Sequence, residues 1–265
     1  MTRTISPSLA GIMEDLELEQ PTLVTADHLA ELARRHGVLT PAKVVAARLR
    51  DRGWLLATGR RGVWEFAPAA VAGAYSVGDP VMPLRAFLVS RPGARCALTF
   101  QAAAWVHGVA DRVPSRLEVA AATADMARQL PSTLAASAFD PHLDYVIHRD
   151  VPVLAPESVV VHMAARPADV RSWSSALEWL PELAGMLRSD ELNGELEGRT
   201  ASIATRTGYL LQGLRPDLAN SLHARTRSQG KVWFGPRASL KRHDAHWQIA
   251  DTLLPFDPRT LAAST

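Results

Sequence analysis

The sequence has a single cysteine and no long apolar run, and these two absences exclude several classes of protein. Cys96 has no second cysteine with which to form a disulfide or a cysteine-based zinc site. No stretch approaches the roughly 18 apolar residues that a membrane-spanning helix needs. The N-terminus becomes acidic where a signal peptide would become apolar, so we expect a cytoplasmic protein with no membrane partner.

The sequence also lacks the short motifs of common enzymes. The GxSxG, P-loop, GxGxxG and HExxH patterns are all absent. Glu118 lies on an expected strand, but apolar residues follow it, so the acid–acid–lysine pattern of many nucleases is missing. His243 and His246 lie close in sequence, but no third metal ligand follows at a spacing typical of a metal site. We therefore predict no catalytic residue, no cofactor and no metal, and a protein that is not an enzyme.

What remains is an ordinary globular composition with one clear break. The 265 residues are 47% hydrophobic and 21% charged, which is typical of a soluble folded chain. Residues 67–83 are rich in alanine, proline and glycine and carry one charge, as a connection between domains would. The sequence therefore predicts two domains, residues 1–80 and residues 81–265.

Charge is distributed unevenly along the chain. Residues 34–62 contain eight basic residues and one acid, Asp51, so this segment carries +7 while the whole chain carries only +2. The rest of the chain is therefore net acidic. A basic patch that is confined to one segment indicates an anionic partner. The basic residues are Arg34, Arg35, Lys43, Arg48, Arg50, Arg52, Arg60 and Arg61.

The first part of the chain predicts two helices separated by a short extended segment. Apolar residues at helical spacing indicate a helix over residues 8–18, and residues 22–24 are β-prone. Thr25 is expected to cap a second helix that ends at Gly37. We expect the acidic run on the first helix to point away from any nucleic acid. That run consists of Glu14, Asp15, Glu17 and Glu19.

A third helix and a hairpin follow. Thr40 before Pro41 predicts a capped helix start, for a helix over residues 40–52. Residues 54–58 and 63–66 are β-prone and flank a glycine-containing turn, which is the pattern of a hairpin. The order helix, strand, helix, helix, hairpin is that of a winged helix-turn-helix. The predicted fold class is α+β, with this winged helix followed by a larger mixed α/β C-terminal domain.

The positions of the basic residues favour double-stranded DNA as the partner. A helix that enters the major groove reads base edges with its outer side chains, and a neighbouring hairpin reaches the backbone or the minor groove. Two alternatives remain open, which are a solvated basic helix beside an ordinary hairpin and a winged helix used only for protein contact. The predicted DNA-binding residues are Thr40, Lys43, Arg48 and Arg50 on the third helix and Arg60 and Arg61 on the turn.

The remainder of the chain alternates helix-like and strand-like segments. Arg206 and Tyr209 are three residues apart on one expected helix, where they form either part of a functional surface or a packed tyrosine beside a partly exposed arginine. His107 is expected to be a hydrogen-bonded histidine rather than a base. Helices are expected over residues 84–89, 99–108, 156–164, 173–187 with a break at Pro181, and 203–226, and strands over residues 116–121, 143–148, 231–234 and 247–253.

Three further segments carry a resemblance to a known family. They are ALTFQAAAWVHGVADRVPSRLEVA (97–120), ATRTGYLL (204–211) and KVWFGPR (231–237). Together with the expected winged helix they resemble the AbiEi family, the antitoxins of type IV toxin-antitoxin systems. The resemblance implies a winged helix that binds inverted repeats ahead of its operon and represses it. It also implies a C-terminal domain that neutralises a nucleotidyltransferase-like toxin, in many members without a stable complex.

The resemblance transfers no catalytic residue. It places the basic DNA-binding surface on residues already singled out, Lys43, Arg48, Arg50, Arg60 and Arg61. We therefore expect a DNA-binding antitoxin and transcriptional autorepressor. Two other hypotheses stay open: an enzymatic C-terminal domain that acts on the toxin or on nucleic acid, and a winged helix that contacts only protein.

Overall fold

The computed structural model describes residues 7–68, 79–226 and 230–262, and its fold is of the mixed α+β class, as predicted. The chain divides into two compact units, Met1–Ala94 and Arg95–Thr265. This division falls after helix α4 (Met82–Ser90), which packs against strand β3, whereas the sequence suggested a boundary at residue 80. Most of the connection expected over residues 67–83 lies outside the described residues. No helix of the described chain has the length and apolarity to cross a membrane.

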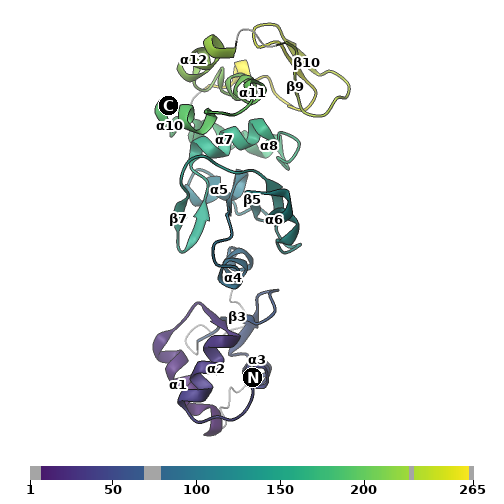
Figure 1. Cartoon of the computed structure of the whole chain (residues 1–265). Coiled ribbons are helices and arrows are strands. Elements are labelled where there is room, and N and C mark those ends of the chain that lie inside the picture. Colours follow the sequence, from purple (N-terminus) through teal and green to yellow (C-terminus); the bar gives the residue numbers. More distant parts are fainter. Residues whose placement is uncertain (1–6, 69–78, 227–229, 263–265) are drawn as a thin grey trace. The chain divides into compact units, whose positions relative to one another are not determined.

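The N-terminal unit contains helices and a small sheet in the predicted order (Figure 1). Its three strands pair antiparallel in the order β1-β3-β2, so β3 is central. This arrangement is consistent with the expected winged helix-turn-helix. The elements are a 3-10 turn (Pro7–Leu9), α1 (Ala10–Glu19), β1 (Leu23–Thr25), α2 (Ala26–Arg35), α3 (Ala42–Asp51), β2 (Leu55–Ala57), β3 (Val63–Phe66) and α4.

Local signals set most of these boundaries. The Thr25 hydroxyl accepts a hydrogen bond from the His28 N–H (3.1 Å) and so caps α2, as predicted. After α3 the chain turns at Gly53, whose φ of 75° is readily available only to glycine. The three helices bury one apolar face each in a core that they share with residues of the sheet. The core of the unit includes Ile12, Leu16, Leu29, Leu32, Val45, Leu49, Trp54 and Phe66.

One predicted boundary is wrong. Thr40 does not cap α3, because Pro41 occupies the cap position and no side chain bonds to the first amides of the helix. Pro41 has a ψ of 140°, which is not helical, so α3 begins only at Ala42. The Pro41 carbonyl instead accepts from the N–H groups of Val44 (2.8 Å) and Val45 (3.1 Å).

The C-terminal unit contains a five-stranded mixed sheet, a group of helices and a second small sheet. The larger sheet has the order β6-β5-β4-β8-β7, and the smaller has the order β10-β11-β9. The elements are β4 (Cys96–Leu98), α5 (Phe100–Val106), β5 (Glu118–Ala121), α6 (Ala124–Gln129), β6 (Ala135–Ala138), β7 (Val146–His148), β8 (Val151–Val153), α7 (Pro156–Ala165), α8 (Trp173–Ala176), α9 (Leu180–Gly185), α10 (Ser189–Leu196), α11 (Ala201–Leu211), α12 (Pro216–Thr226), β9 (Val232–Phe234), β10 (Arg242–Asp244), β11 (Ile249–Asp251) and a 3-10 turn (Pro258–Thr260).

Helix α7 is the centre of this unit. Nearly all of its residues are buried, and α5, α10 and α11 all pack against it. It is buried on all sides rather than on one stripe, because neighbouring elements cover it all round. The predicted split at Pro181 is confirmed, because the segment forms two short helices, α8 and α9.

Glu195 of α10 joins three segments of the unit from a fully buried position. One of its carboxylate oxygens accepts from the N–H groups of His142 (3.1 Å) and Leu143 (3.2 Å) and from the Ser158 hydroxyl (2.6 Å). The other oxygen pairs with Arg199. A buried charge is costly unless it is paired and hydrogen-bonded, and here both conditions are met.

Candidate nucleic-acid interface

Helix α3 presents a basic outer face. Val45, Ala46 and Leu49 are buried and fix the helix on the core, which leaves Lys43, Arg48 and Arg50 exposed. Within the described part of the chain, none of these three cations forms an ion pair with an acid. Thr40 lies half-buried just ahead of the helix.

The tip of the hairpin is an ordered turn. Gly59 and Gly62 adopt φ values of 78° and 79°, which glycine adopts without strain. The buried Thr58 hydroxyl donates to the Val63 carbonyl (2.8 Å) and accepts from the Arg60 N–H (3.3 Å). These hydrogen bonds therefore fix the backbone of the turn that carries Arg60 and Arg61.

The two arginines of the turn have different surroundings. The Arg60 Nε donates to the Ser90 hydroxyl (2.9 Å), and its guanidinium lies over the Phe87 ring at 5.6 Å from the centroid. Both partners belong to α4. Arg61 is exposed and has no acidic partner among the described residues. The sequence analysis predicted the same role for Arg60 and Arg61. In the described structure Arg60 is bound to α4, whereas Arg61 has no acidic partner.

A hollow of about 300 Å³ lies between α3 and the hairpin. Arg50 lines one side of it, and Arg60 and Arg61 line the other, with Trp64 also on its wall. The structure thus brings together the C-terminal part of α3 and the tip of the hairpin. Lys43 and Arg48 are exposed on the same helix but do not line this hollow.

Acids from outside the basic segment neutralise its first two arginines. Asp15 of α1 accepts from Arg35 (2.9 Å) and from His36 (2.8 Å), and Glu31 pairs with Arg34. The hydrogen bond from His36, together with Arg35, lowers the pKa of Asp15 below its usual value. Asp15, one residue of the acidic run on α1, therefore contributes to the contact between α1 and the end of α2. The unpaired positive charge is concentrated on α3 and the hairpin.

The C-terminal unit holds the other residues that the sequence singled out. Tyr209 is fully buried and donates to Asp251 (3.0 Å), and burial raises its pKa. Arg206 donates through Nε to the Trp233 carbonyl (2.7 Å), and its burial lowers its pKa. The two residues join α11 to the small sheet, so they form a packing contact and not a functional surface.

The histidines of this unit are engaged in different contacts. His246 stacks on His223 with ring centroids 3.8 Å apart, while His243 is exposed. Among residues 7–68, 79–226 and 230–262, no three His, Cys, Asp or Glu side chains are grouped so that they could hold a metal ion. His107 bonds the Leu154 carbonyl (2.8 Å), as expected of a satisfied histidine.

The sequence analysis did not name His162 and did not predict the burial of Glu118. His162 is fully buried between the Thr99 hydroxyl (2.8 Å) and the Ser137 hydroxyl (3.1 Å), and burial holds its pKa well below the usual value. Glu118 accepts from the Ala102 N–H (3.2 Å), and burial raises its pKa to about 7. Their hydrogen-bond partners come from segments far apart in sequence, so no short sequence motif predicts either cluster.

The comparison with known families applies to this second unit. The family model of the AbiEi antitoxin C-terminal domain matches residues 94–213, just under half of the chain. The resemblance to AbiEi antitoxins is confirmed for these residues. The matched segment begins at the boundary between the two compact units and ends just after α11, so it contains α7, Glu118, His162 and Glu195.

A solved structure resembles the chain over nearly its full length. The crystal structure of the RV2827C protein from Mycobacterium tuberculosis superposes with a TM-score of 0.80 and 24% sequence identity. The match covers 96% of this chain and 94% of that chain, and at this identity it speaks for the fold alone. No curated protein matches the sequence.

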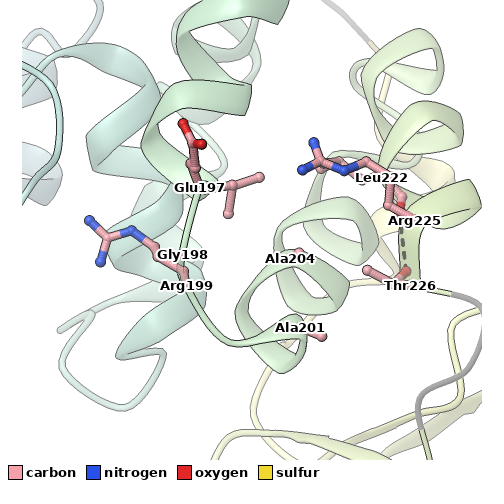
Figure 2. Close-up of a pocket in the computed structure, with 9 residues that line it drawn as sticks. Glu197, Gly198, Arg199, Ala201, Ala204, Leu222, Arg225 and Thr226 are labelled. Atoms are coloured by element: carbon pink, nitrogen blue, oxygen red, sulfur yellow. Dashed lines mark hydrogen bonds between the residues drawn. The ribbon is translucent and has the colours of Figure 1, made fainter.

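The matched segment also contributes most of the lining of a pocket of about 210 Å³ between the α10–α11 connection and α12 (Figure 2). Three of the polar side chains around it have partners within the fold, while the exposed Glu197 also lines it. Arg199 pairs with Glu195, Arg225 donates to Asn193 (2.7 Å), and the Thr226 hydroxyl donates to the Leu222 carbonyl (3.1 Å).

Proposed function

We propose that this chain is a DNA-binding antitoxin and transcriptional autorepressor, whose partner toxin is nucleotidyltransferase-like. The AbiEi domain supports the antitoxin role. The observation that supports DNA binding is the unpaired basic surface on α3 and the hairpin, with Lys43, Arg48 and Arg50 exposed on the helix and Arg61 exposed on the turn. Phosphate groups are the natural partners of such a surface.

In this proposal each of the two units has its own function. The N-terminal unit binds an operator with inverted repeats, and the C-terminal unit neutralises the toxin in the cytoplasm. We propose no catalytic step. In support, Arg199, Arg225 and Thr226 of the pocket in Figure 2 are engaged within the fold, and the enzyme motifs are missing from the sequence.

The division of labour predicts the behaviour of two fragments. Residues 1–94 should bind duplex DNA in a salt-dependent manner, because they contain α3, the hairpin and the α4 anchor of Arg60. Residues 95–265 should show no DNA binding and should retain toxin neutralisation. Gel-shift titrations and a growth-rescue assay with the cognate toxin measure the two activities. Operator binding by residues 95–265 would show that the DNA-binding surface lies in the other unit.

The helix and the hairpin should make different contributions to DNA binding. Arg50→Ala or Lys43→Ala should cost more on a selected operator than on random duplex, by about 1–3 kcal/mol for each lost base contact. Arg61→Ala should weaken both duplexes by similar factors and flatten the log–log salt slope by roughly one unit, as expected of a phosphate contact. Fluorescence anisotropy with both duplexes at several salt concentrations separates the two patterns.

Arg34→Ala is the matched control, because Arg34 is an exposed arginine of the same unit that is already paired with Glu31. It should leave both affinities nearly unchanged. If Arg61→Ala lost specificity while the α3 variants did not, the hairpin would be the element that reads the sequence.

A further inference from the structure

Leu39 is the most exposed large apolar side chain among the described residues, at 99% of its full accessible surface. It lies in the connection between α2 and α3, where the backbone is held on both sides. The Val38 N–H donates to the Ala33 carbonyl (2.8 Å), and the Val44 N–H donates to the Pro41 carbonyl (2.8 Å). Packing among the described residues therefore gives no reason for a leucine at this position, and an ordered turn presents it to the outside.

The neighbours of Leu39 suggest what it meets. It lies three residues ahead of α3, and Thr40 and Lys43 follow it at the start of that helix. In helix-turn-helix proteins, the residues at the N-terminal end of the recognition helix contact base edges in the major groove. Thymine is the base that presents an apolar group there, its C5-methyl.

We propose that Leu39 contacts the C5-methyl group of a thymine in the operator and so helps to select its sequence. This inference rests on the proposed DNA binding. The side chains at the helix start then offer an apolar group, a hydroxyl and a cation, in Leu39, Thr40 and Lys43. An apolar side chain discriminates thymine without a hydrogen bond, because burial of a methyl group is favourable and no other base carries one in the major groove.

The test removes one methyl group at a time from the DNA. The full chain first selects duplexes from a random-sequence pool, and each thymine of the selected duplex is then replaced by uracil, which lacks only the methyl. At the contacted position the substitution should weaken binding of the unaltered chain by about fourfold, the equivalent of burying one methyl group. Leu39→Ala should lower affinity for the thymine duplex and remove the difference between thymine and uracil at that position alone.

Leu18→Ala is the matched control, because Leu18 is an exposed leucine (84%) on the acidic helix α1 of the same unit. It should keep the full thymine preference. If Leu39→Ala weakened thymine and uracil duplexes equally, or changed neither, the methyl contact would be refuted. Failure of the unaltered chain to enrich any duplex would instead overturn the proposed DNA binding itself, and this inference with it.

Discussion

Raising the salt concentration from about 50 to about 200 mM is expected to weaken DNA binding by roughly 10²–10³-fold. The expectation follows from counterion release, in which each neutralised phosphate contributes about −0.9 to the log–log slope. Four to six contacts give a slope of roughly −3.5 to −5.5. The cations available for these contacts are Lys43, Arg48, Arg50 and Arg61, which have no acidic partner among the described residues, together with Arg60 at the edge of the same hollow. Titrations of the full chain at five or so salt concentrations measure the slope.

The control for this result is a chain in which one of the surface cations is removed. Arg48→Ala should reduce the slope by about one unit if Arg48 reaches a phosphate. Arg34→Ala should not change it, because Glu31 already neutralises that side chain. A slope near zero for the unaltered chain would remove the electrostatic basis of the proposal and favour a winged helix that contacts only protein.

Replacing Glu195 by alanine is expected to lower the free energy of unfolding of the C-terminal unit by about 3–5 kcal/mol. The substitution leaves the N–H groups of His142 and Leu143 without their acceptor and removes the partner of the largely buried Arg199. An unpaired buried charge and unsatisfied amides each carry a large penalty. Urea unfolding followed by tryptophan fluorescence is a suitable measurement, because five of the seven tryptophans lie in this unit.

Glu195→Gln provides the matched comparison. The amide oxygen of glutamine still accepts from the two N–H groups, while the charge pair with Arg199 is lost. We expect a cost clearly smaller than that of the alanine variant. Equal costs would show that the ion pair, rather than the backbone hydrogen bonds, carries the stabilisation. An unchanged unfolding midpoint for Glu195→Ala would show that the cluster does not stabilise the unit.

The elements that the sequence predicted well are those set by local signals. Thr25 as a cap, Gly53 as a stop and the hairpin over residues 55–66 all depend on residues within a few positions of one another. The assignment of Thr40 as a cap failed, although it used the same kind of signal, because Thr40-Pro41 is compatible with a helix that starts one residue later. Strands β4, β6, β8 and β10 were missed, since they are short and their pairing is decided by distant partners.

The candidate site shows the same limit. Counting charges over residues 34–62 identifies the basic segment. The count does not distinguish cations that are paired within the fold from cations that have no partner among the described residues. Asp15 lies twenty residues before Arg35 in the chain and removes it from the free surface. Ser90 lies thirty residues after Arg60 and anchors it. No window of local sequence contains either pair.

The bond between Arg60 and Ser90 has a mechanical consequence. Ser90 is the last residue of α4, and β4 of the C-terminal unit begins only six residues later, at Cys96. Tension on the connecting segment would therefore act on α4, the helix that holds the tip of the hairpin. In the proposed DNA-binding surface, the tip of the hairpin is thus tied to the helix that leads into the second unit, whereas α3 is held by its own buried apolar face.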